Sequence, residues 1–126
     1  MKVARWIFGI AGVYGVLLIA PLYFAEGRIA QSDPPAITHP EFFYGFIGVT
    51  LAWQLVFFVI ARNPLRYRPL ILVSVLEKLA YGIPAIALFA QQRVKAMTLA
   101  FGCVDLLLGA LFVLAFFLTP RAEAST

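Results

Sequence analysis

Residues 96–118 read AMTLAFGCVDLLLGALFVLAFFL, a long apolar run that contains one charged side chain, Asp105. A helix needs about 20 apolar residues to cross a hydrocarbon core of about 30 Å, and this run is long enough. Lipid offers no partner to an unpaired backbone N–H or C=O, so we expect a transmembrane helix here. Strands of a membrane barrel are about ten residues long and alternate in polarity, which this run does not do.

Three further runs of the same kind precede it, and they extend from about 3 to 25, from 41 to 61 and from 69 to 90. Together the four spans occupy most of the chain and leave no room for a soluble domain. The first span is longer than the apolar part of a signal peptide and lacks a small-x-small cleavage site, so we expect it to be retained. We predict an all-α protein with a single integral membrane domain, residues 1–126, folded as an antiparallel bundle of four transmembrane helices.

The composition excludes several classes of protein. The chain is 63% hydrophobic and 13% charged, whereas a soluble domain is about half apolar and about a quarter charged. These values, with a mean hydropathy of +0.92, exclude a soluble globular enzyme and a disordered chain. We expect no nucleic acid as a partner, because the net charge of +4 is mainly a signal of membrane topology.

Lysine and arginine in the short flanks of the spans set the orientation, because cytoplasmic flanks carry the excess of these residues. One side of the predicted membrane carries six of them and the other side carries three. We therefore predict that both termini are cytoplasmic and that this is a multi-pass protein of the cell membrane, which in a bacterium is the inner membrane. The six are Lys2, Arg5, Arg62, Arg66, Arg68 and Arg121, and the three are Arg28, Arg93 and Lys95.

Signatures of cofactors and metals are missing from the sequence. Cys103 is the only cysteine and His39 the only histidine, which excludes an internal disulfide, a CxxC redox pair and a bis-histidine haem within one chain. No group of His, Cys, Asp and Glu has the spacing of a metal site, and no glycine-rich phosphate loop or Ser-His-Asp set occurs. We expect neither a cofactor nor a metal, and the catalytic residues, if any exist, stay unknown.

Charged residues inside a membrane span are functional candidates by default, because each costs about 2.5 to 3.5 kcal/mol to insert. Glu77 and Lys78 lie in the third span and Asp105 lies in the fourth. Gln54 is the most polar residue inside the second span. Each of these residues lies near the middle of its own span, so we expect three helices to bring polar groups to one level near the bilayer midplane.

Helical spacing places these polar groups on defined faces. Four polar residues of the third span follow the i, i+3, i+4, i+7 pattern of one stripe, and Thr50 precedes Gln54 by one turn. Trp53 lies deep beside Gln54, and its indole N–H needs an acceptor. Turning these stripes inward hides them from lipid. The candidates for an intramembrane ligand pocket are therefore Thr50, Trp53, Gln54, Ser74, Glu77, Lys78, Tyr81 and Asp105.

Lys78 has two candidate partners among the carboxylates. Adjacent residues on a helix point about 100° apart and do not face each other. We therefore expect Lys78 to pair with Asp105 across the contact between the third and fourth spans rather than with Glu77. This pairing leaves Glu77 without a cation, and we expect it to be protonated and able to exchange a proton or donate a hydrogen bond.

The connection between the first two spans, residues 26–40, is the longest and contains Pro34 and Pro35, which favour an extended chain in its later part. It is either a lid over the mouth of the bundle or a spacer. The sequence Thr38-His39-Pro40-Glu41 is typical of a helix start. His39 is therefore either a capping residue or, with Tyr44, part of the mouth of the pocket.

Most of the chain resembles the EXPERA group of four-helix membrane proteins, which includes sterol isomerases and the sigma-2 receptor. The resemblance rests on Pro40-Glu41-Phe42-Phe43, Thr50-Leu51-Ala52-Trp53-Gln54-Leu55 and Ile83-Pro84. It implies a lipophilic pocket that opens laterally to the membrane and binds sterol-like or amphiphilic molecules, with Gln54 matching a pocket glutamine. Thr50 stands where that group has an acidic residue, and the acidic residue of its first helix has no counterpart here. The chain is equally similar to small bacterial DoxX-like proteins, which share the four-helix plan and are the alternative family.

Several functions follow from these observations. The first is the binding of a lipid or hydrophobic small molecule around the polar midplane residues. The alternatives are a small proton-coupled transporter working as a homodimer, a membrane-embedded isomerase-like enzyme, and an accessory subunit of a membrane complex. A further alternative is that the polar residues form a network that only fixes the register of the helices. Among these functions we incline against an enzyme.

Overall fold

The computed structural model describes residues 2–121, and their regular structure is helical throughout. Four stretches are long and apolar enough to cross a membrane, as predicted. The all-α class is therefore confirmed, and the chain is a membrane protein. The long helices are α1 (Lys2–Ile19), α3 (Pro40–Arg62), α4 (Arg68–Ala90) and α5 (Ala96–Leu118), and two short elements, η1 (Ala20–Phe24) and α2 (Glu26–Ser32), lie between α1 and α3.

The first span and the connection after it differ from the prediction. The span expected as one helix over 3–25 ends its α-helical part at Ile19 and continues as the 3-10 helix η1. Pro21 lies in the first two positions of η1, and its missing N–H cannot continue the α-helical ladder. The connection expected as a loop begins with α2, whose seven residues are too few to show an apolar period.

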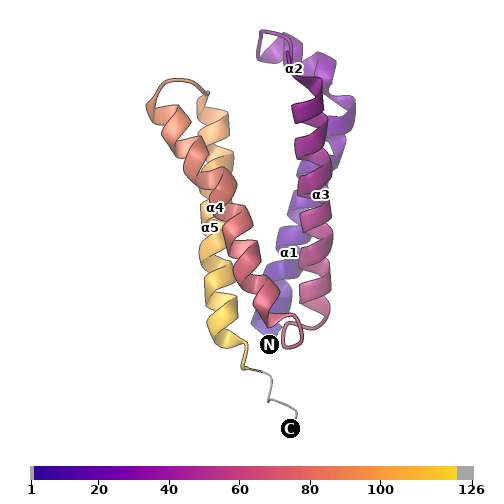
Figure 1. The fold of residues 1–126 in the computed structure, drawn as a ribbon, viewed down its shortest axis with the longest axis vertical. Helices are drawn as coiled ribbons and strands as arrows, with labels where there is room; N and C mark the ends of the chain where they lie inside the picture. The colour runs from indigo at the N-terminus through magenta and orange to yellow at the C-terminus, as the bar shows by residue number, and fades with distance from the viewer. Residues whose placement is uncertain (1, 122–126) are drawn as a thin grey trace.

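The helices form two hairpins that meet at one end of the molecule and separate toward the other (Figure 1). Figure 1 shows the start of α1 and the end of α5 together, which we call the terminal end, and α2 and the α4–α5 connection at the opposite, loop end. The closest pairs are α4 with α5 and α1 with α3. The hairpins touch mainly through α1 and α5, while α3 contacts α4 only lightly despite the short connection between them.

An aromatic triad, Phe8, Phe57 and Phe112, fills the space between the hairpins near the terminal end. The rings of Phe8 and Phe112 are stacked with centroids 4.2 Å apart, and Phe57 meets Phe112 edge-on at 5.0 Å. All three side chains are fully buried. Helices in lipid associate through packing rather than through the hydrophobic effect, so this triad is a tertiary contact that holds the hairpins together. Around it lie Ala4, Ala11, Ile60, Ile71 and Ala115.

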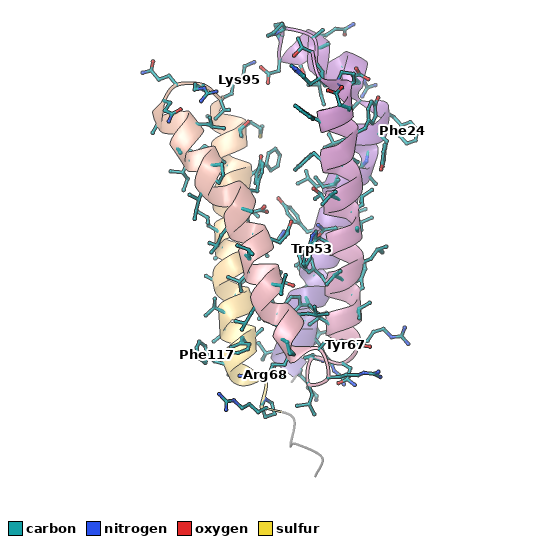
Figure 2. All side chains as sticks on the ribbon, viewed as in Figure 1. Phe24, Trp53, Tyr67, Arg68, Lys95 and Phe117 are labelled. Carbon is teal, nitrogen blue, oxygen red and sulfur yellow. The ribbon has the colours of Figure 1, made fainter. Side chains whose placement is uncertain are left out.

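Arg68 fastens the start of α4 to the end of α5 at the terminal end (Figure 2). Its Nε donates a hydrogen bond to the carbonyl oxygen of Thr119 at 2.8 Å, and its guanidinium lies 3.7 Å from the centroid of the Phe116 ring. Closer to the loop end, α4 and α5 approach through Gly102, where a Cβ atom would lie 2.6 Å from the Cβ of Ala85. Small residues at such a crossing allow close helix packing in membranes.

Candidate functional site

A cavity of about 200 Å³ lies between the two hairpins, on the loop-end side of the aromatic triad. Each of the four long helices contributes residues to its wall. Its apolar wall includes Leu18, Ile19, Phe46 and Phe101, and its polar wall consists of Tyr14, Thr50, Gln54, Glu77, Lys78, Tyr81 and Asp105.

The structure brings most of the predicted pocket residues to this cavity and leaves two of them outside. Trp53 lines a separate groove between α3 and α4, because it precedes Gln54 by one residue and points about 100° away from it. Ser74 is buried in α4 one helical turn closer to the terminal end than Lys78. Its hydroxyl donates a hydrogen bond to the carbonyl oxygen of Leu70 at 2.8 Å. The predicted residues in the cavity wall are Thr50, Gln54, Glu77, Lys78, Tyr81 and Asp105.

The ammonium group of Lys78 lies between two carboxylates. Its Nζ is 3.6 Å from Oδ1 of Asp105, as predicted, and also 3.6 Å from Oε2 of Glu77. The expectation that Glu77 lacks a cation is therefore wrong. The flexible four-carbon stem of lysine lets the ammonium turn toward a neighbour whose Cβ points elsewhere. Both distances exceed the usual 2.9 Å of a direct hydrogen bond, so Lys78 is shared by the two carboxylates.

These three side chains are shielded from the surroundings. Lys78 is only 4% exposed, and the side chains of Glu77 and Asp105 are 16% and 17% exposed. The Nζ of Lys78 also lies 5.1 Å from the ring centroid of Phe57. Lys78 therefore connects the charged side chains of the cavity wall to the aromatic triad through Phe57.

Gln54 is the most buried polar side chain of the cavity, with 1% exposure. Its Nε2 donates to the carbonyl oxygen of Thr50 at 2.8 Å, but its Oε1 has no hydrogen-bond partner within the described residues. Oε2 of Glu77 has no hydrogen-bond partner there either, although the ammonium of Lys78 lies 3.6 Å from it. Gly15 of α1 makes room for the amide, since a Cβ at that position would overlap the Gln54 side chain. An unsatisfied buried acceptor costs about 1 to 3 kcal/mol.

Sequence reasoning missed the contribution of α1. Tyr14 lines the cavity together with Leu18 and Leu22. These residues follow i, i+4, i+8 spacing and form one stripe. The signal in the sequence is a tyrosine in the middle of an otherwise apolar span, where its hydroxyl group needs a polar surrounding.

The two residues predicted at the mouth do not line the cavity. His39 occupies the N-cap position of α3, but its side chain makes no capping hydrogen bond and instead stacks on Phe42. Tyr44 donates a hydrogen bond of 2.7 Å to Oε2 of Glu26 and thereby joins α3 to α2. Both residues belong to the junction between the first hairpin and its short helix.

An ion pair connects the two hairpins at the loop end. The Nζ of Lys95 lies 2.9 Å from Oδ1 of Asp33 and 3.4 Å from the carbonyl oxygen of Ser32. Figure 2 shows Lys95 at this end, where the hairpins are farthest apart. Both side chains are more than half exposed, so the pair is screened by solvent and contributes little stability.

A groove of about 390 Å³ on the outer surface between α3 and α4 adjoins the cavity. Four residues line both spaces, and they are Phe46, Thr50, Glu77 and Tyr81. The rings of Phe46 and Tyr81 are neighbours, with centroids 6.1 Å apart and planes tilted by 32°. The cavity is thus separated from the apolar groove by side chains rather than by backbone.

Comparisons with family models, with curated proteins and with solved structures found no match to this chain. The resemblance to EXPERA and DoxX-like proteins therefore stays a prediction. Within residues 2–121, no three side chains of His, Cys, Asp or Glu come together as a metal site requires.

Proposed function

We propose that this protein binds a lipid or another hydrophobic small molecule in the cavity between its hairpins, with the polar end of the ligand at Gln54, Glu77, Lys78 and Asp105. The observation that carries the proposal is the cavity itself, whose lining combines apolar side chains with these four polar ones, while Oε1 of Gln54 stays buried against Gly15 without a hydrogen-bond partner within the described residues. A network that served only to fix helix register would be expected to satisfy its own members.

In this proposal the four spans form an antiparallel bundle in the cell membrane with both termini in the cytoplasm. The basic residues Arg62, Arg66 and Arg68 are close to the terminal end, as are Lys2 and Arg5, and such residues favour the cytoplasmic side. The cavity then lies in the half of the membrane that faces away from the cytoplasm, with its polar cluster near the midplane.

A second candidate function is a small proton-coupled transporter that works as a homodimer. The observation that favours it is the position of Lys78 at equal distances from Glu77 and Asp105. A proton on either carboxylate would leave the other one paired with the ammonium, so protonation need not strand a buried charge. Proton release into a weakly buffered solution on ligand addition would support this candidate, and its absence would contradict it.

The binding proposal is tested by native mass spectrometry of the protein purified in mild detergent. We expect an adduct of defined mass on the wild-type protein. Gly15→Leu places a side chain where Gln54 lies and should remove the adduct. Gly9→Leu is the matched control on the same helix, because nothing lies within 4 Å of a Cβ at Gly9, and it should keep the adduct. Wild-type protein without an adduct, or an adduct kept by Gly15→Leu, would contradict the proposal.

A further inference from the structure

A groove of about 580 Å³ lies on the outer surface of α1, in the half of the helix that is nearer to the terminal end. Its floor is Gly9, because no heavy atom lies within 4 Å of the position that a Cβ would occupy there. Large side chains surround this position, and Trp6 and Ile10 among them are 70% and 58% exposed. Arg5 and Val13 also line the groove. It is a notch in the outer face of α1 that no side chain of the described residues fills.

Two basic residues lie on the same face of α1 as this notch. Lys2 and Arg5 begin a stripe with i, i+3, i+4, i+7, i+11 spacing, which continues through Trp6, Gly9 and Val13. Arg5 lines the groove, and Lys2 lies at the start of the helix, one turn closer to the terminal end. Both are exposed, and neither is paired with a carboxylate of the described residues. The notch therefore has two cations at its outer end and apolar side chains below them.

The two ends of the molecule differ in charge. The terminal end carries the six basic residues assigned above to the cytoplasmic side and, within residues 2–121, no acidic residue. The loop end is balanced, with three acidic and three basic residues, which are Glu26, Asp33, Glu41, Arg28, Arg93 and Lys95. Clusters of basic residues beside a membrane span attract anionic lipid head groups. The charge around the notch is therefore complementary to an anionic lipid.

Charge also argues against a second copy of this chain as the occupant of the notch. Two copies with the same orientation in the membrane that met along this face of α1 would bring their Lys2 and Arg5 side chains together. Like charges placed opposite each other in an interface are costly. A lipid brings the opposite charge and an apolar chain in one molecule.

We propose that this notch binds an anionic phospholipid, whose phosphate is held by Lys2 and Arg5 and one of whose acyl chains lies over Gly9. A guanidinium can donate two parallel hydrogen bonds to a phosphate, and the ammonium of Lys2 adds a second charge. The ring of Trp6 suits the level between head group and chain, because it is apolar and carries one N–H donor. The site goes beyond the binding function proposed for the cavity, with which it shares only Tyr14.

The inference is tested by the quenching of Trp6 fluorescence with brominated lipids. The chain has two tryptophans, so Trp53→Phe leaves Trp6 as the only one. This variant is placed in phosphatidylcholine nanodiscs that contain either phosphatidylglycerol or phosphatidylcholine with the same brominated chains. We expect phosphatidylglycerol to bind beside Trp6 at least about fivefold more tightly, which is the effect of one basic residue near an anionic surface. High salt should reduce this preference.

Two double variants separate the notch from the general charge of the terminal end. Lys2→Gln with Arg5→Gln removes both cations of the proposed site and should lower the preference for phosphatidylglycerol to about one. Arg66→Gln with Arg121→Gln is the matched control, because it removes two charges from the same end but outside the lining of the groove. It should keep the preference.

Two glycine variants separate the notch from the cavity. Gly9→Leu fills the notch and should weaken the binding of phosphatidylglycerol beside Trp6, although both cations remain. Gly15→Leu acts on the side chain of Gln54 in the cavity wall and should leave this binding unchanged. A phospholipid that stays bound in detergent is distinguished from the cavity ligand in the same way, because only Gly9→Leu should release it.

The outcomes that would overturn the inference are distinct. Equal binding of the two brominated lipids would overturn it, because a chain in the notch would then need no cation. Equal losses in the two double variants would also overturn it, since the attraction would then belong to the whole terminal end. If Trp53→Phe does not fold, subtracting the signal of Trp6→Phe from that of the wild-type protein gives the same comparison.

Discussion

The terminal half and the loop half of this molecule are built from the same four helices, yet they differ in what lies between the hairpins. In the terminal half the space is filled by Phe8, Phe57 and Phe112, whose rings are fully buried. In the loop half the same space holds a cavity whose wall carries Gln54 and the Lys78 cluster. One half is packed with apolar rings, and the other contains polar atoms without partners.

This difference separates the residues that hold the fold from those that need another explanation. Packing is the main force between helices in lipid, and the aromatic triad supplies it without help from the cavity. The polar residues of the loop half leave the buried Oε1 of Gln54 without a hydrogen-bond partner within the described residues, which costs stability rather than adding to it. The cavity is therefore not what holds the helices together, which is consistent with the binding function proposed for it.

The largest expected effect comes from two phenylalanines on the same helix. Phe112→Ala removes a ring from the buried triad and should lower the free energy of unfolding by about 3 to 5 kcal/mol. Phe101→Ala is the matched control, because Phe101 is only partly buried in the cavity wall, and it should cost about 1 kcal/mol or less. Reversible unfolding in detergent measures both, and equal losses would remove the distinction between the two halves.

The next largest effect concerns the shared lysine. Lys78→Met leaves Glu77 and Asp105 buried without a cation and should destabilise the protein by about 3 kcal/mol. Asp105→Asn should cost clearly less, because Lys78 keeps Glu77 at 3.6 Å. The double variant Lys78→Met with Asp105→Leu should recover only part of the loss, since Glu77 stays unpaired. Full recovery of the unfolding free energy would show that Lys78 pairs with Asp105 alone.

The sequence is sufficient to predict the spans and the convergence of their polar faces. Runs of apolar residues locate the four helices, and the depth of Gln54, Lys78 and Asp105 in their spans places them at one level. These are local properties, read from length and helical period. They hold because lipid restricts the chain to helices whose polar side chains turn inward.

The sequence does not show where the hairpins separate. For this reason the predicted pocket wrongly includes one residue and lacks another. The packed half depends on three rings that come from three different helices, which is a long-range property. Ser74 was expected in the pocket but lies on the packed side of this boundary, while Tyr14 lies on the open side and was missed. The pairing of Lys78 depends on its rotamer, which helical spacing alone does not fix.

A smaller effect is expected at the terminal end, where Arg68 joins α4 to α5. Arg68→Ala should lower the free energy of unfolding by about 2 kcal/mol, because it removes a charged hydrogen bond to the Thr119 carbonyl and the stack on Phe116. Arg68→Lys keeps the charge but not the planar stacking group and should recover less than half of this loss. If Arg68→Lys unfolds like the wild-type protein, charge alone fastens this end.

The smallest effect is expected at the loop end, and it tests whether anything there resists separation of the hairpins. Lys95 and Asp33 are 62% and 57% exposed at their side chains, and exposed ion pairs contribute about 0 to 1 kcal/mol. Lys95→Met should therefore change the unfolding free energy by less than about 1 kcal/mol, and the charge exchange Lys95→Asp with Asp33→Lys should restore even that. High salt should weaken the wild-type contact in the same way.

A loss as large as that of Phe112→Ala would mean that the loop end is held as firmly as the terminal end. In that case the open half would owe its shape to this ion pair, and access of a ligand to the cavity would depend on opening it.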